Sequence, residues 1–305
     1  MAILLAIGRK AFAVVVDDRH ERLMEVLPGV NCGGCGYPGC SAYAQGIIDG
    51  KSKPTACPPG GPAVAISVGQ ILGIEIAVSE PLVALVACAG DNAASALRGT
   101  YAGLTDCKAA HDLAGGPKSC LHGCMGLGTC ATVCVFGAID KTDNGLVVIN
   151  KEKCTGCGTC SRVCPRVVIR MVPRKEEVHV LCNNPDKAKS VKEVCTVGCT
   201  GCKLCTRQSP LLVMNGDLAV VSTEIEGNVP KSCALVCPQG TIVDTREFNH
   251  FDWVSNPEKR RMFELTQAQW KEEEKARKAA AKEKNAPKKG EAPADATTDN
   301  KGVDA

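Results

Sequence analysis

Apolar residues along this chain occur in short runs that glycine and polar residues interrupt. The amphipathic spacing of residues 18–27 predicts a short helix, and Pro28-Gly29 directly after it marks the expected end of that helix. Residues 62–78 form a longer apolar stretch that predicts a second helix. The apolar run at residues 82–87 predicts a buried strand.

The pattern changes near residue 256, where Lys, Glu and Ala become frequent and Pro, Asp and Thr follow. Residues 257–284 predict a solvated helix because they carry few apolar anchors, namely Met262, Phe263, Leu265 and Trp270. The alternative is a helix that docks on the rest of the protein. The sparse apolar face favours the solvated helix over this alternative. Residues 285–305 are expected to be disordered.

Composition excludes several classes of function. Residues 1–7 are too few to span a bilayer, and Gln70 and Glu75 interrupt the stretch 62–78. The formal net charge is only +3 and no Lys/Arg stripe alternates with aromatic residues, so we expect no nucleic-acid partner. No G-x-G-x-x-G follows a predicted strand, so we expect no bound nucleotide or flavin. Aromatic residues make up only 3% of the chain, which predicts weak cores that metal groups could stabilise.

The 21 cysteines indicate what that metal chemistry is. One run has the C-x2-C-x2-C-x3-C-P spacing of bacterial ferredoxins, with its cysteines at Cys154, Cys157, Cys160 and Cys164. In that pattern three thiolates hold one [4Fe–4S] cube and the fourth reaches the neighbouring cube. A disulfide framework fits poorly, because the cysteine count is odd and no signal peptide is present. Structural zinc prefers two separated cysteine pairs at longer intervals.

A second motif near the N-terminus has a different spacing, C-x2-C-x4-C-x16-C. Its cysteines are Cys32, Cys35, Cys40 and Cys57. Five glycines near the first three allow the backbone to wrap closely and to turn its N–H groups toward sulfur. We expect these four thiols to hold one [4Fe–4S] cube.

Residues 120–170 and 195–243 form an internal repeat. Four positions align without gaps: Cys120, Cys124, Cys130 and Cys134 correspond to Cys195, Cys199, Cys205 and Ser209. Each copy continues with a short apolar hairpin and closes on a Cys-Pro pair. The hairpins are residues 146–149 and 218–221, and the closing cysteines are Cys164 and Cys237. This spacing predicts two ferredoxin modules in tandem.

Ferredoxin crossover assigns two cubes to the first copy, since each cube takes three cysteines from one run and the Cys-Pro cysteine from the other. The first cube would bind Cys134, Cys154, Cys157 and Cys160. The second would bind Cys124, Cys130 and Cys164, but its usual middle ligand position holds Leu127. Cys120 is the natural substitute for that ligand.

The second copy predicts only one cube, held by Cys199, Cys202, Cys205 and Cys237. Its partner cube would depend on Ser209, Gly227, Pro230 and Cys233. One cysteine and a serine cannot hold a cube securely, because the thiolate is the preferred soft ligand. We therefore expect this cluster to be absent and about four cubes to be present in the chain.

Five cysteines have no assigned role: Cys88, Cys107, Cys182, Cys195 and Cys233. We interpret them as small buried side chains or spare thiols. Cys195 differs from the others because it matches Cys120 in the repeat.

The predicted fold class is α+β, with a small four-cysteine [4Fe–4S] domain, two tandem ferredoxin-like modules and a disordered charged tail. The four-cysteine domain is expected at residues 16–78, a connecting α/β segment at 79–119, the bicluster module at 120–175, the second and partly degenerate module at 176–245, and the charged, largely disordered tail at 246–305.

With these motifs the chain resembles the B-subunit of Rnf complexes, the ion-translocating ferredoxin:NAD oxidoreductases of bacterial membranes. The resemblance covers residues 9–243, approximately. It rests on the glycine-rich string that ends at Cys40, on Lys10-Ala-Phe12, on the segment from Gly123 to Cys130 and on the segment from Val194 to Cys202.

The resemblance implies a redox relay that accepts electrons from reduced ferredoxin and passes them to the other Rnf subunits. It would lie peripherally on the cytoplasmic face of the cell (inner) membrane. Translocation of Na+ or H+ and reduction of NAD would occur elsewhere in the complex, and no residue of this chain need act as a general acid, base or nucleophile. Because the family usually begins with a transmembrane helix, residues 1–15 are expected to be the remnant of a membrane anchor.

Three alternatives to this relay remain open. A corrinoid iron–sulfur methyl carrier has a similar N-terminal motif, but it needs a large barrel that residues 60–120 are too few to supply. A free-standing polyferredoxin would use the same clusters without the complex. A structural zinc protein would contain neither iron nor acid-labile sulfide.

Overall fold

The computed structural model describes residues 17–77, 80–222, 224–225, 227–246 and 257–284. The membrane-anchor remnant predicted at residues 1–15 and the disorder predicted at residues 285–305 lie outside this part of the chain. Within it, no helix combines the length and the apolarity that crossing a bilayer requires. Helices and short antiparallel strands are mixed, so the α+β prediction is confirmed at this level.

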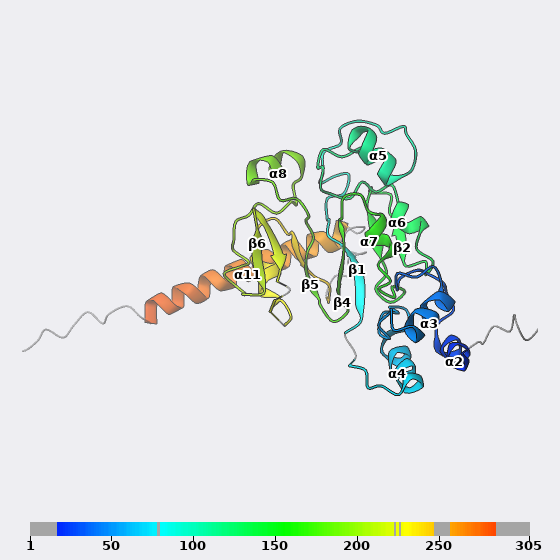
Figure 1. Ribbon diagram of the computed structural model, residues 1–305. Helices are drawn as coiled ribbons and strands as arrows, with labels where there is room; N and C mark the ends of the chain where they lie inside the picture. The colour runs from blue at the N-terminus through cyan, green and yellow to red at the C-terminus, as the bar shows by residue number, and fades with distance from the viewer. Residues whose placement is uncertain (1–16, 78–79, 223, 226, 247–256, 285–305) are drawn as a thin grey trace, which may run out of the picture.

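Three helices near the N-terminus pack around a small core of their own (Figure 1, blue). They are α2 (Asp18–Val26), α3 (Cys40–Ile48) and α4 (Gly61–Leu72). Leu23, Tyr43 and Val68 are almost completely buried between them. The helix predicted at residues 18–27 is thus confirmed as α2. The second predicted helix is shorter than expected, because Gly73 takes a left-handed conformation (φ 71°) and ends α4.

We call residues 80–175, which include the region predicted as the first ferredoxin-like module, the first module. It contains two antiparallel strand pairs. β1 (Leu82–Val86) pairs with β4 (Ile169–Pro173), and β2 (Ile139–Lys141) pairs with β3 (Val147–Ile149). Two short helices lie within the cysteine runs, α6 (Thr129–Thr132) around Cys130 and α7 (Thr159–Val163) around Cys160. Helix α5 (Cys107–Ala114) lies between β1 and α6 in the sequence. The strand predicted at residues 82–87 is confirmed, and its pairing with β4 makes it part of the sheet of this module.

The second module repeats the order of the strand pairs. β5 (Val178–Val180) pairs with β8 (Ile242–Asp244), and β6 (Leu212–Asn215) pairs with β7 (Leu218–Val221). Its helices are α8 (Ala188–Val194), before the first cysteine run, and α9 (Ser232–Val236), before the Cys-Pro pair. In both modules the outer strands pair with each other and the inner strands form a hairpin.

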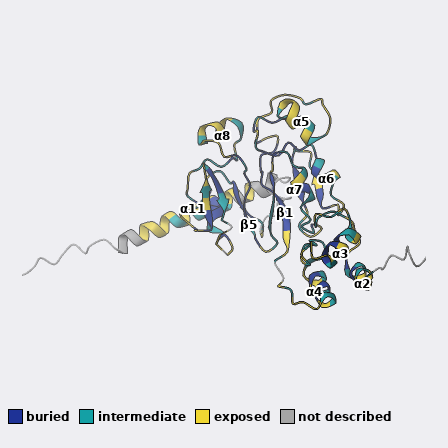
Figure 2. Ribbon diagram, viewed as in Figure 1, coloured by how far each residue is buried: buried dark blue, intermediate teal, exposed yellow. Residues whose placement is uncertain are grey.

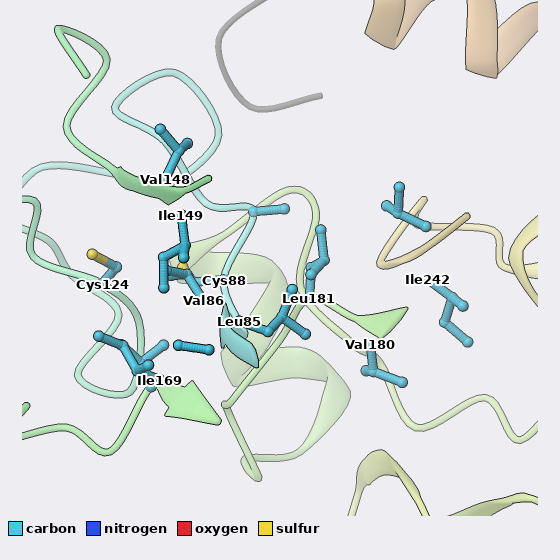
Figure 3. Packing of buried hydrophobic residues seen from close by; sticks show 14 of the residues in the cluster. Leu85, Val86, Cys88, Cys124, Val148, Ile149, Ile169, Val180, Leu181 and Ile242 are labelled. Atoms are coloured by element: carbon cyan, nitrogen blue, oxygen red, sulfur yellow. The ribbon is translucent and has the colours of Figure 1, made fainter. Parts of the chain in front are cut away.

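One apolar core runs through both modules (Figure 2, dark blue). Val86, Val147 and Val243 are almost completely buried in it. Figure 3 shows Leu85 and Val86 of the first module together with Val180 and Leu181 of the second in this core. Directly after β1, the N–H of Ala89 donates a hydrogen bond of 3.1 Å to the carbonyl oxygen of Leu181. The two modules are therefore joined along the residues that follow β1 and β5.

Near the C-terminus the structure corrects one prediction. Residues 257–284 form helix α11 (Pro257–Lys284), which at 1.5 Å per residue is about 40 Å long (Figure 1, orange). Gln267 of this helix is buried, and its Nε2 donates to the carbonyl oxygens of Ala234 and Cys237, both at 2.9 Å. The preference for a solvated helix is therefore wrong for this part of α11. The docking contact is a polar one, which the sparse apolar face does not reveal.

We predict that Gln267→Ala weakens the docking of α11 by about 1–3 kcal/mol, because two buried carbonyl groups lose their donor. The measurement is hydrogen–deuterium exchange of the amides of residues 261–270, which should speed up roughly tenfold for each 1.4 kcal/mol lost. Gln269→Ala is the matched control, since Gln269 is exposed on the same helix. Equal exchange in both variants would contradict the prediction.

Candidate metal centres

All 21 cysteines are free thiols, and most of them gather in sets of four inside the protein. Three sets each line one small cavity, and we name these the Cys124, Cys154 and Cys199 cavities. Among the described residues, no three His, Cys, Asp or Glu side chains converge closely enough to hold a single metal ion. Four thiols around one cavity are the ligand set of a [4Fe–4S] cube.

The Cys154 cavity brings together the full set that ferredoxin spacing predicts. Its cysteines are Cys134, Cys154, Cys157 and Cys160. Cys134 comes from the run that precedes β2 and the other three from the run around α7, so the ligands cross between the two halves of the module. The N–H of Ala84 donates to Cys154 Sγ and the N–H of Ala138 to Cys134 Sγ, both at 3.4 Å. Such donors stabilise thiolates bound to iron.

The Cys199 cavity holds the predicted set of the second module, which is Cys199, Cys202, Cys205 and Cys237. Its loop has the same glycine turn as the Cys154 loop. Gly156 (φ 72°) and Gly201 (φ 62°) both lie in the left-handed region. A Cβ at Gly156 would overlap the carbonyl oxygen of Leu82, and one at Gly201 would lie 2.9 Å from that of Asp217. Glycine is needed at both positions because a neighbouring backbone segment closes the cavity there.

The lining of the Cys124 cavity differs from the predicted ligand set in one cysteine. It is lined by Cys124, Cys130 and Cys164, and the fourth cysteine is Cys107. Cys120, the predicted substitute, is not among the lining residues of this cavity and lies beside Gly123 and Asn184 instead. Cys107 was missed because it lies far outside the cysteine run.

Hydrogen bonds fix Cys107 at this cavity. Asp106 caps α5 by accepting from the N–H of Ala109 at 2.8 Å, and its second oxygen accepts from the hydroxyl of Thr129 at 3.0 Å. Thr129 Oγ1 in turn accepts from the N–H of Cys107 at 2.7 Å. Since Thr129 is the residue before Cys130, these bonds connect the start of α5 directly to the cysteine loop. The only sequence signal for this arrangement is the Asp-Cys pair at a helix start, which is not specific.

Burial makes free thiolates unfavourable in these cavities. Desolvation raises the pKa of Cys124 and of Cys205 to about 12, and that of Cys160 to about 11, with the neighbouring thiols adding to the effect for each of them. A bound iron cluster stabilises the deprotonated sulfur that the protein alone disfavours. The buried, four-thiol cavities therefore fit the [4Fe–4S] group that the motifs predict.

The four N-terminal cysteines also lie close together. Burial raises the pKa of the Cys57 thiol, and Cys35, Cys40 and Cys32 act on it electrostatically in the same direction. Asn31, which has a positive φ of 51°, accepts a hydrogen bond from the N–H of Cys40 at 2.8 Å. This bond connects the beginning of the cysteine loop to the start of α3.

The N-terminal cysteine loop contacts the Cys154 cavity. A Cβ at Gly34 would lie 3.0 Å from Cys157 Cβ and 3.1 Å from the Cys157 carbonyl oxygen. The guanidinium of Arg162 reaches the same contact, with its Nη2 atom 3.5 Å from the Gly33 carbonyl oxygen and 3.0 Å from the Thr159 hydroxyl. The loop that carries Cys32 and Cys35 therefore lies against a cysteine of the first module.

The residues that align with the ligands of the cluster expected to be absent lie beside side chains of the apolar core. A Cβ at Gly227 would lie 3.3 Å from Leu211, and Val229 is buried nearby in the same core. The buried Ser209 accepts from the N–H of Leu211 at 3.2 Å. Cys233 is fully buried, and its Sγ donates to the Cys205 carbonyl oxygen at 3.7 Å.

The other unassigned cysteines do not behave as isolated thiols. Cys88, Cys182 and Cys195, together with Cys120, lie near one another where the two modules meet. Cys107 and these three are thus the residues whose surroundings the sequence interpretation missed.

Comparison with known proteins agrees with the motifs. Residues 27–59 match a family model described as "Putative Fe-S cluster", and residues 147–170 match one described as "4Fe-4S binding domain". The chain is 38% identical over 247 residues to the B-subunit of the ion-translocating oxidoreductase complex of Methanosarcina acetivorans, covering 79% of this chain and 92% of that protein. It is 41% identical over 244 residues to the B-subunit of the proton-translocating ferredoxin:NAD(+) oxidoreductase complex of Clostridium ljungdahlii, covering 79% and 86%. The Na(+)-translocating counterpart of Acetobacterium woodii is 42% identical over 195 residues, which are 64% of this chain and 59% of that protein.

We predict that Cys107→Ala removes about four iron atoms per chain, because the Cys124 cavity loses its fourth thiol. Iron and acid-labile sulfide are measured on the anaerobically purified full chain. Cys233→Ala is the control, since it also removes a buried thiol but leaves all three cavities intact. Unchanged iron in Cys107→Ala would show that another residue completes this set.

Proposed function

The chain belongs to the B-subunit family of ion-translocating oxidoreductase (Rnf) complexes, and from this premise we propose that it relays electrons from reduced ferredoxin to other subunits of such a complex. Members of this family are iron–sulfur electron-transfer subunits. The observation that carries the proposal is the contact of the N-terminal cysteine loop with Cys157, because it brings a fourth set of thiols up to the cavities of the modules.

The cysteine sets follow one another through the first module. Beyond the contact at Gly34 comes the Cys154 cavity, and the thiols of Cys160 and Cys130 lie near enough to act on each other electrostatically. The Cys124 cavity is therefore next to the Cys154 cavity, as in a two-cluster ferredoxin. When bound, [4Fe–4S] cubes supply one-electron redox chemistry, with potentials set by hydrogen bonds to sulfur, burial and solvent access.

The protein residues hold and tune these sites and perform no acid–base step. In this proposal the four thiols of each cavity are its ligands, the N–H groups of Ala84 and Ala138 donate to two of them, and the apolar core excludes water. Cys202 is exposed, alone among the cysteines, so the Cys199 cavity is the one closest to solvent at a thiol. A partner subunit could approach that site closely.

In the same proposal, association with the membrane is peripheral and comes from the other subunits of the complex, on the cytoplasmic face. Ion translocation and the reduction of NAD(+) take place in those subunits. This division of work is supported by the family assignment and by the makeup of the cavities, which are lined by thiols and apolar groups.

The direct test is anaerobic mixing of chemically reduced ferredoxin with the oxidised full chain. We expect the visible absorption of the oxidised clusters in the chain to bleach while ferredoxin is reoxidised, with equal numbers of electrons lost and gained. Chain from which iron has been removed by a chelator serves as the control and should leave ferredoxin reduced. If the clusters of the loaded chain stay oxidised beside reduced ferredoxin, the proposed donor is wrong.

The contact at Gly34 gives a second prediction. Gly34→Ala should slow electron equilibration between the N-terminal cluster and the modules, and Gly34→Val should slow it more. The reason is that a larger side chain pushes the loop further from Cys157. The measurement is the rate of equilibration after rapid photoreduction, followed by freeze-quench EPR. Iron per chain must stay at the wild-type value in both variants. Equal rates in all three proteins would contradict a route through this contact.

A further inference from the structure

Four cysteines left over from the ferredoxin pattern occupy equivalent places in the two modules. Cys88 lies two residues after the end of β1, and Cys182 lies two residues after the end of β5. Cys120 and Cys195 are the aligned first cysteines of the two repeats. Each module therefore contributes one cysteine of each kind.

The contacts bring the four thiols around a common space. A Cβ at Gly90 would lie 3.2 Å from Cys195 Sγ and 3.8 Å from Cys88 Sγ. A Cβ at Gly123 would lie 3.3 Å from Cys88 Sγ and 3.4 Å from Cys120 Sγ. In both cases the absence of a side chain leaves open the space beside two sulfur atoms.

Cys182, from the second module, is the fourth cysteine of the set. Its Sγ accepts from the N–H of Cys199 at 3.4 Å and from the N–H of Asn184 at 3.5 Å. The side-chain amide of the same Asn184 donates to Cys120 Sγ at 3.7 Å. Cys88 lies within electrostatic range of all three other thiols, so it is the common neighbour of the set.

Two buried cations face these thiols. Lys118 is 1% exposed, donates to the carbonyl oxygens of Gly90 and Gly145 at 2.7 Å, and acts electrostatically on Cys88 and Cys195. Arg166 is 7% exposed and donates to the carbonyl oxygen of Cys120 at 2.8 Å. Buried positive charge is costly unless an anionic group offsets it. A cluster held by four thiolates is anionic and would lie beside both cations.

We propose that Cys88, Cys120, Cys182 and Cys195 hold a further [4Fe–4S] cube between the two modules. A single zinc ion would need its ligands to converge on one point, and no three such side chains in the described ranges do so. The N–H donors to Cys182 are of the kind that the Cys154 cavity provides for its own sulfurs. With this set, every cysteine except Cys233 belongs to a group of four.

The place of this site suggests its role, a step that rests on the proposed electron relay. Cys88 is next to Cys124, because the backbone N–H of Cys124 faces the sulfur of Cys88. Cys182 is next to Cys199, whose N–H donates to the sulfur of Cys182. The cube would therefore lie between the Cys124 cavity of the first module and the Cys199 cavity of the second. It would provide the step between the two modules.

The test counts iron, acid-labile sulfide and zinc in the full chain, purified anaerobically and reconstituted. Five cubes give about twenty iron atoms per chain, and four give about sixteen. The double variant Cys88→Ala/Cys195→Ala should lose about four iron atoms, and Cys120→Ala/Cys182→Ala should lose the same number. Cys233→Ala, which removes the one cysteine outside all sets, should keep the wild-type content.

About sixteen iron atoms in the wild type, unchanged iron in both double variants, or one zinc atom per chain that the variants lose would each overturn the proposal. If a double variant fails to fold and loses all iron, the iron content of the wild type alone decides the test: about twenty atoms support the further cube and about sixteen overturn it. The result is separate from the ferredoxin experiment, because iron content does not depend on which donor reduces the clusters. In a double variant that folds, we also expect photoreduced electrons to stay in one module, which EPR would detect as slower equilibration.

Discussion

The architecture depends on bringing four sulfur atoms around each cavity when no single run of the ferredoxin modules supplies all four. Cys134 must reach the set of Cys154, and Cys237 must reach the set of Cys199 from beyond a hairpin. This crossover ties the two halves of each module to each other. Aromatic side chains are scarce, and the cysteines that line the cavities belong to the apolar core of the modules. The metal groups are thus part of the core, and their loss should loosen each module as a unit.

The outer strand pairs of the two modules determine how the modules contact each other. Pairing of β1 with β4, and of β5 with β8, places the residues that follow β1 and β5 at the boundary between modules. Ala89 and Leu181 then meet there by a backbone hydrogen bond. Cys88 and Cys182 are neighbours of these two residues in sequence, so the same contact that joins the modules also brings the two thiols together. The sheet pairing and the shared cysteine site have one structural cause.

Sequence reasoning succeeded where the chemistry is local and failed where a partner comes from a distance. Cysteine spacing predicted the sets of the Cys154 and Cys199 cavities, because a cube fixes the intervals within a run. It could not predict that Cys107 lies at the Cys124 cavity, since that depends on tertiary hydrogen bonds of Thr129. The docking of α11 was missed for a similar reason, because it rests on the polar side chain of Gln267 and leaves no apolar periodicity.

The second module differs from the first in the place where its ligand pattern fails. Leu211 and Val229 occupy the core near Gly227, and α11 closes the adjacent end of α9 through Gln267. A cube at that position would lack cysteines at Ser209, Gly227 and Pro230, which is why the sequence predicts its absence. In the proposed relay the Cys199 cavity is next to the proposed site at Cys182, and it also has an exposed thiol, Cys202. If the second cluster of this module is absent, as the sequence predicts, the proposed series of clusters ends at the Cys199 cavity, where the exposed Cys202 gives electrons a route out of the chain.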